Sequence, residues 1–203
     1  MTLVNPPVVL EAMPAREGMA LDEFLRRQDE HPFELIEGKE VRVTPSVFGS
    51  GEVLSLLLEA LFAYNAPLKL GRIYSDTTFV FPDLPEGKWV SGSRIPDVMY
   101  YTNERLTLYR AQTVNQRIKP LMLVPDLAVE IVSPTDRLPK VWLKATIYLE
   151  DGVRLVWVIN PMRRMVTIFA QAEAPITLYA ADTLSGGEVL PGFSLALNTL
   201  FES

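Results

Sequence analysis

The sequence predicts an α/β (α+β) protein in which a central mixed β-sheet is flanked by helices. Two observations carry this prediction. Short apolar and β-branched runs, which favour strands, alternate along the chain with amphipathic runs of helical period. The central strands are also apolar on both faces, which is typical of a sheet covered by helices on both sides.

The first half of the chain contains one strong helix signal and several strand signals. Residues 51–64 carry apolar side chains at helical spacing, and Pro67 is expected to end this helix. The other expected elements are an amphipathic helix over 19–28, strands over 33–36 and 41–44, extended structure over 72–81, a loop or edge hairpin over 82–94 and a strand over 95–101.

The second half is organised around a strand–helix–strand unit. A strand over 126–132 precedes a helix over 139–150 with Asp136 as its cap, and an apolar strand over 154–159 follows. This order predicts a right-handed crossover between parallel strands. The other expected elements are a helix starting at Asn103, a hairpin partner over 165–169, late strands over 176–179 and 188–190, and a short helix within 193–200.

Length and composition predict one folded domain. The chain has 203 residues, of which 48% are hydrophobic, so we expect a single domain over 19–203 after a loosely ordered arm over 1–18. The absence of cysteine excludes disulfides, thiolate zinc sites and a cysteine nucleophile. No apolar run approaches the roughly 20 residues that a membrane span needs, and the expected location is the cytoplasm.

The net charge of −6 argues against a protein that coats nucleic acid by bulk electrostatic attraction. It leaves open an enzyme whose acidic centre holds a metal ion and whose basic groups lie locally around that centre.

Two acidic strands carry the candidate chemistry. Glu130 stands among Val129, Ile131 and Val132, and Asp97 opens the other strand. An ionised carboxylate in such surroundings is costly unless it is paired or binds a cation. Two carboxylates at the ends of neighbouring strands suit a hard divalent ion such as Mg²⁺. The local pattern is equally compatible with Asp97 capping a turn and Glu130 pairing with a buried arginine.

Four segments in register carry a resemblance to a known family. They are residues 33–38, the run Pro96-Asp97-Val98, residues 129–134 and residues 152–161. This order resembles the Uma-two family of bacterial restriction-endonuclease-like proteins, and the likeness covers about residues 19–200. The variant segment over residues 133–138, with Lys144 four residues before Tyr148, is similar to one branch of that family.

The resemblance implies the PD-(D/E)xK nuclease superfamily and its restriction-endonuclease-like fold. Asp97 and Glu130 would then be the two metal-binding acids, and Glu34 the acid that completes the metal site. Val132 stands where the superfamily has its lysine, and Lys144 on the following helix would replace it. The implied catalytic set is Glu34, Asp97, Glu130 and Lys144, with the three acids holding Mg²⁺ or Mn²⁺.

The function expected from these residues is metal-dependent hydrolysis of DNA phosphodiester bonds, by a homodimer. The alternative is a catalytically silent scaffold that binds nucleic acid or a partner protein, because the family's histidine after Pro45-Ser46 is absent here. A third class, a hydrolase of small phosphodiesters, would spare plasmid DNA.

Overall fold

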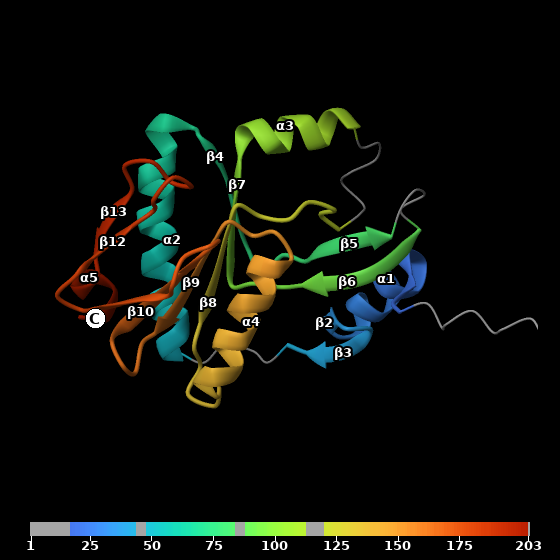
Figure 1. Ribbon diagram of the computed structural model, residues 1–203, viewed down its shortest axis with the longest axis horizontal. Helices are drawn as coiled ribbons and strands as arrows, with labels where there is room; N and C mark the ends of the chain where they lie inside the picture. The colour runs from blue at the N-terminus through green and yellow to red at the C-terminus, as the bar shows by residue number, and fades with distance from the viewer. Residues whose placement is uncertain (1–16, 44–47, 84–87, 113–119, 203) are drawn as a thin grey trace, which may run out of the picture.

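The computed structural model describes residues 17–43, 48–83, 88–112 and 120–202, and it forms two larger sheets and one small one (Figure 1). The first sheet has six strands in the order β11-β10-β9-β8-β7-β4. These strands are β4 (Gly71–Ser75), β7 (Val98–Thr102), β8 (Leu127–Ile131), β9 (Leu155–Asn160), β10 (Met165–Ala170) and β11 (Ile176–Tyr179).

The predicted strand–helix–strand unit is confirmed as a parallel pair. Strands β8 and β9 run parallel, with Glu130 opposite Val158, and helix α4 (Leu138–Glu150) connects them. Every other pair in this sheet is antiparallel, including β7 with β8. The sheet is therefore mixed, as the sequence predicted, and it brings the start of β7 next to the end of β8.

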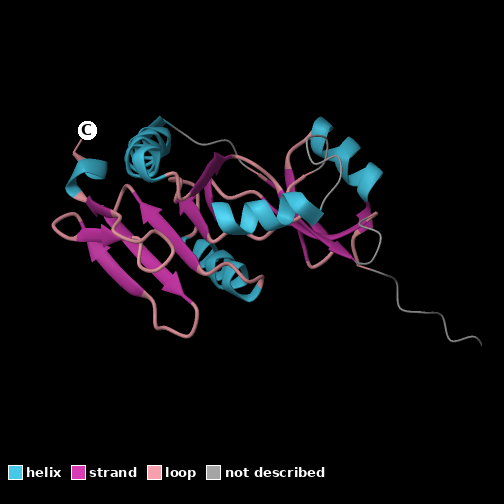
Figure 2. Cartoon of the chain, turned by 90° about the horizontal axis from the view of Figure 1, so that it is seen from above, coloured by secondary structure: helices cyan, strands magenta, loops and turns pink. Residues whose placement is uncertain are grey.

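Helices cover both faces of the first sheet, which explains why its central strands are apolar throughout (Figure 2). Helix α2 (Phe48–Leu68) packs Leu57 and Leu61 against one face, where Leu127 and Val129 of β8 are buried. Helix α4 packs Ala145 and Tyr148 against the other face with Ala128. Because side chains alternate along a strand, Glu130 points to the α4 side.

The second sheet consists of β1 (Met19–Ala20), β2 (Phe33–Ile36), β3 (Lys39–Arg42), β5 (Phe79–Asp83) and β6 (Trp89–Arg94). Helix α1 (Leu21–Glu30) closes its core, in which the rings of Phe24 and Phe33 lie 5.3 Å apart. Strand β6 pairs with β1, β2 and β5. The stretch expected as a loop or edge hairpin thus contributes a central strand of this sheet.

A three-residue connection, Ile95 to Asp97, carries the chain from β6 of the second sheet into β7 of the first. The expected strand over 95–101 begins only at Val98 for this reason. Asp97 consequently lies at the junction of the two sheets rather than inside a strand.

The remaining elements include two corrections to the sequence-based expectations. Residues 188–190 are not a strand; the late pair is β12 (Thr183–Ser185) with β13 (Ser194–Ala196). Asp136 does not cap α4, whose N-cap is Arg137, because its carboxylate accepts a hydrogen bond from the Ser133 amide. Helices α3 (Asn103–Gln112) and α5 (Asn198–Phe201) lie where helices were expected.

Two predicted features touch the limits of the described residues. The expected arm over 1–18 falls almost wholly outside them, so the division into arm and domain stays a prediction. Within the described ranges, no helix has the length and apolar character needed to cross a bilayer.

We expect an added methyl group to change the free energy of unfolding in opposite directions at two glycines. A Cβ on Gly71 would lie 2.2 Å from the Tyr101 carbonyl oxygen and 2.4 Å from the Tyr100 ring, whereas a Cβ on Gly51 in α2 meets nothing within 4 Å. We expect Gly71→Ala to lower the free energy of unfolding by at least about 2 kcal/mol. Gly51→Ala should raise it by about 0.5–1 kcal/mol through helix propensity. Urea denaturation measures both, and equal effects would contradict the packing around Gly71.

Candidate active site

Asp97 is held at the end of strand β8 by a backbone contact. Its Oδ2 accepts a hydrogen bond of 2.5 Å from the amide of Ile131, the residue after Glu130. In the described part of the chain, no hydrogen bond or ion pair involves its second oxygen. The β7–β8 pairing thus places the Asp97 carboxylate beside Glu130, which is the arrangement expected for two carboxylates at the ends of neighbouring strands.

Glu130 points into the space between β8 and helix α4. Its Oε1 accepts a hydrogen bond of 2.6 Å from the Tyr148 hydroxyl and lies 2.9 Å from Lys144 Nζ. The side chain is 12% exposed. The alternative in which Glu130 pairs with a buried arginine does not describe this arrangement, because its cation is Lys144.

Lys144 and Tyr148 reach Glu130 from the same face of α4, because residues four apart on a helix lie one above the other. Lys144 Nζ lies 5.5 Å from the centroid of the Tyr148 ring. Tyr148 is fully buried and contacts both Glu130 and, at 3.5 Å, Glu34. Helix α4 follows β8 in the chain and folds back over it. Lys144, about two turns into the helix, therefore lies close to Glu130 of β8.

Glu34 comes from β2 of the second sheet and completes this group of side chains. Its Oε1 lies 3.0 Å from Lys144 Nζ and accepts a 2.8 Å hydrogen bond from the Ile95 amide. Lys144 therefore bridges a carboxylate of each large sheet. The connection over 95–97 serves both ends of the site, since its first residue binds Glu34 and its last is Asp97.

The electrostatics of the site follow from burial and from an excess of carboxylates. Burial raises the pKa of Glu130 to about 7; Lys144 opposes this rise, and the Asp97 and Glu34 charges add to it. Burial likewise raises the pKa of Asp97 to about 6, against the Ile131 hydrogen bond. For Lys144, burial lowers the pKa but the two glutamates outweigh it, so the net shift is upward. The Lys144 ammonium thus offsets the negative charge of three carboxylates, those of Glu34, Asp97 and Glu130.

The structure brings Glu34, Glu130 and Lys144 into direct contact and places Asp97 one residue away along β8. It also shows two groups that the sequence analysis did not assign. Tyr148 was noted only for its spacing from Lys144, and that four-residue spacing was the available signal. The buried ion pair of Arg94 with Asp151, at 2.9 Å, joins β6 to the C-terminus of α4 and had no recognisable sequence signal.

The donor set fits a hard divalent cation at Asp97 and Glu130. Each has a carboxylate oxygen without a hydrogen bond or ion pair to any described residue. Among the described residues, however, no three acidic or histidine side chains are grouped so that they could hold a metal ion. Lys144 stands between Glu34 and Glu130 and so separates these two acids. Asp97 and Glu130 would still suffice for Mg²⁺, which commonly takes one or two protein carboxylates with water as its other ligands.

Replacing Lys144 should destabilise the protein strongly. Lys144→Met removes the cation between Glu34 and Glu130 and leaves two buried carboxylates unpaired. We expect the free energy of unfolding at pH 7.5 to fall by about 3 kcal/mol or more. Lys140→Met, one turn earlier and exposed to solvent at the start of α4, is the matched control and should change it by less than about 0.5 kcal/mol. Similar losses in both variants would contradict a structural role for the bridge.

Glu130→Gln should alter the pH dependence of stability in metal-free buffer. The pKa of Glu130 is raised from 4.5 to about 7, so the stabilisation it provides is complete below about pH 4.5 and is lost as the pH rises through 7. The amide cannot titrate, and Lys144 keeps Glu34 as its partner. The variant should therefore melt at a higher temperature than the wild type at pH 8, and the gain should vanish near pH 5. A lower melting temperature at pH 8 would show that the ion pair outweighs burial.

Comparisons with known proteins show the fold and the family of this chain. The crystal structure of a protein described as a putative nuclease belonging to DUF820, from Anabaena variabilis, superposes with a TM-score of 0.73 and 20% sequence identity, over 91% of this chain and 98% of that one. A search of curated proteins found no match. The fold is that of restriction endonucleases, which generally use divalent metals. The family model described as Uma2, putative restriction endonuclease, matches residues 21–198, and the chain therefore belongs to the Uma2 family.

Proposed function

We propose that this protein is a metal-dependent endonuclease that hydrolyses phosphodiester bonds in DNA. Family and fold indicate a nuclease in general terms. The observation that carries the finer proposal is the placement of two carboxylates and one ammonium. Asp97 binds the amide next to Glu130, and Lys144 lies 2.9 Å from Glu130.

Asp97 and Glu130 would hold Mg²⁺ or Mn²⁺, and Glu34 would complete the acidic set. The bound metal would polarise the phosphate and lower the pKa of an attacking water. The two acids sit on strand ends whose backbone is fixed by the sheet, which gives the rigid geometry that a catalytic site requires.

Lys144 would stabilise the negative charge that develops on the attacked phosphate. Its ammonium is positioned by Glu34 at 3.0 Å and by the Tyr148 ring beneath it. Tyr148 would orient Glu130 through the hydrogen bond to Oε1. Glu34 thus has two proposed roles, as an acid of the metal site and as the partner that keeps Lys144 in place.

A second candidate function is a catalytically silent binding protein on the same fold. The observation in its favour is that Lys144 already neutralises part of the site by contacting both glutamates. The absent family histidine belongs to the stretch after Pro45-Ser46, and residues 44–47 lie outside the described ranges. For the active enzyme we further propose that it is a homodimer and that it acts in the cytoplasm. Light scattering would measure its oligomeric state in solution.

Cleavage and metal binding together test the proposal. Purified protein with supercoiled and single-stranded DNA should give products in Mg²⁺ or Mn²⁺ and none in EDTA. Asp97→Asn and Glu130→Gln should each lower the cleavage rate at least about 100-fold, the scale of losing one electrostatic group from a catalytic site. Both should also weaken Mn²⁺ binding measured by calorimetry.

The matched control is Asp22→Asn, an exposed acid on α1 that should leave cleavage unchanged. A wild-type protein that binds no Mn²⁺ and cuts neither DNA would establish the silent scaffold. Cleavage of small phosphodiesters without cleavage of DNA would establish the third class, a hydrolase of other substrates.

A further inference from the structure

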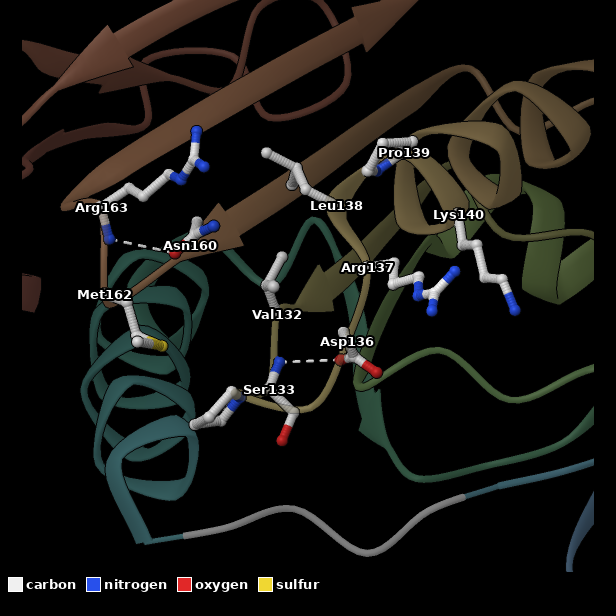
Figure 3. Close-up of a pocket in the computed structure, with 11 residues that line it drawn as sticks. Val132, Ser133, Asp136, Arg137, Leu138, Pro139, Lys140, Asn160, Met162 and Arg163 are labelled. Atoms are coloured by element: carbon white, nitrogen blue, oxygen red, sulfur yellow. Dashed lines mark hydrogen bonds between the residues drawn. The ribbon is translucent and has the colours of Figure 1, made fainter.

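A cavity of about 690 Å³ lies at the end of β8, where Val132 of its lining follows Glu130 by two residues (Figure 3). Three segments from different parts of the fold form its walls. They are the end of β8 with the turn after it, the first turn of α4, and the turn between β9 and β10; the lining side chains include Val132, Arg137, Lys140, Asn160 and Arg163.

The charge of this cavity is opposite to that of the protein as a whole. Arg137, Lys140 and Arg163 line it, are exposed to solvent and form no ion pair or side-chain hydrogen bond within the described chain. Asp136 is the acidic residue of the lining, and its Oδ2 accepts a 2.8 Å hydrogen bond from the Ser133 amide. Three unpaired cations around one hollow contrast with a chain of net charge −6.

The cavity lies at the end of the strand that carries Glu130. Val132 lines the cavity and follows Glu130 by two residues, so both side chains leave β8 on its α4 face. Two residues of extended chain span about 7 Å. Successive phosphates of one DNA strand advance about 3.4 Å along the axis, so the cavity starts within about two nucleotides of a phosphate at Glu130.

We infer that this cavity binds the phosphodiester backbone of the substrate strand, one or two nucleotides from the bond that is cut. Arg137, Lys140 and Arg163 would contact its phosphate oxygens, and the arginines can do so through two donors at once. Leu138 and Met162 in the same lining would contact the sugar. This inference rests on the proposed function, because it places the strand relative to Asp97 and Glu130.

The inference explains how an acidic protein would hold an anionic polymer. Bulk electrostatic attraction is absent, so affinity must come from a few local contacts. Such contacts would also set the direction in which the strand crosses the two carboxylates, because Arg163 of the β9–β10 turn and Lys140 of α4 stand on opposite sides of the cavity (Figure 3).

A pair of matched double variants tests the cavity. The test variant is Lys140→Ala with Arg163→Ala, and the control is Lys69→Ala with Arg72→Ala, which removes one lysine and one arginine near the opposite end of the β4–β7 pair from Asp97. Both are made in Glu130→Gln, so that DNA is bound without being cut. Fluorescence anisotropy with a labelled duplex and a labelled single strand, over a series of NaCl concentrations, gives affinity and its salt dependence.

We expect the test variant to bind about tenfold more weakly than its parent and to lower the salt slope by about 1.8 for duplex or 1.4 for single strand. The control should keep the parent's affinity and slope, and both should keep the parent's melting temperature. Equal losses in the two variants, or none in the test variant, would overturn the cavity as a phosphate site while leaving the nuclease proposal standing. A parent and a wild type that bind neither DNA would overturn both.

Discussion

The contact of Lys144 with Glu34 and Glu130 is the constraint on which the rest of the molecule depends. It joins β2 of the second sheet, β8 of the first sheet and helix α4 at one nitrogen atom. Burying three such charges is costly unless each has a partner at close range. Part of the cost is offset here because the Ile95 amide donates a hydrogen bond to Glu34 and the Tyr148 hydroxyl donates one to Glu130. The ion pair of Arg94 with Asp151 reinforces the same junction from the other end of α4.

The same junction gathers more carboxylates than cations. Burial raises the pKa of both Asp97 and Glu130, and the Asp97 charge adds to the rise at Glu130. Each retains an oxygen free of the described side chains and backbone. A divalent ion would relieve their repulsion and favour their ionised forms. The same repulsion would therefore lower the stability of the metal-free protein and raise its affinity for metal. Natural proteins commonly accept such unfavourable interactions at the sites where function requires them.

The position of the lysine shows how far local sequence reasoning reaches. Val132 stands where the superfamily's lysine is expected, and it lies on the same face of β8 as Glu130. The Lys144 ammonium reaches Glu130 from α4, because the helix folds back over the strand that precedes it. The four-residue spacing of Lys144 and Tyr148 indicated that the two share a helix face. It did not indicate that this face meets a carboxylate from a different sheet.

The sequence by itself determined the mixed sheet, the parallel β8–β9 unit and the two covering helices, because these depend on local periodicity and on short connections. The local pattern also singled out Asp97 and Glu130 as candidate acids, whereas Glu34 came from the family resemblance. Only the tertiary structure decided that 82–94 supplies a central strand, that 188–190 is not a strand, and that Asp136 binds a turn amide instead of capping α4. It also decided the partners of Glu34. Those outcomes depend on pairing between segments distant in the chain, and no local pattern encodes which backbone groups another segment will satisfy.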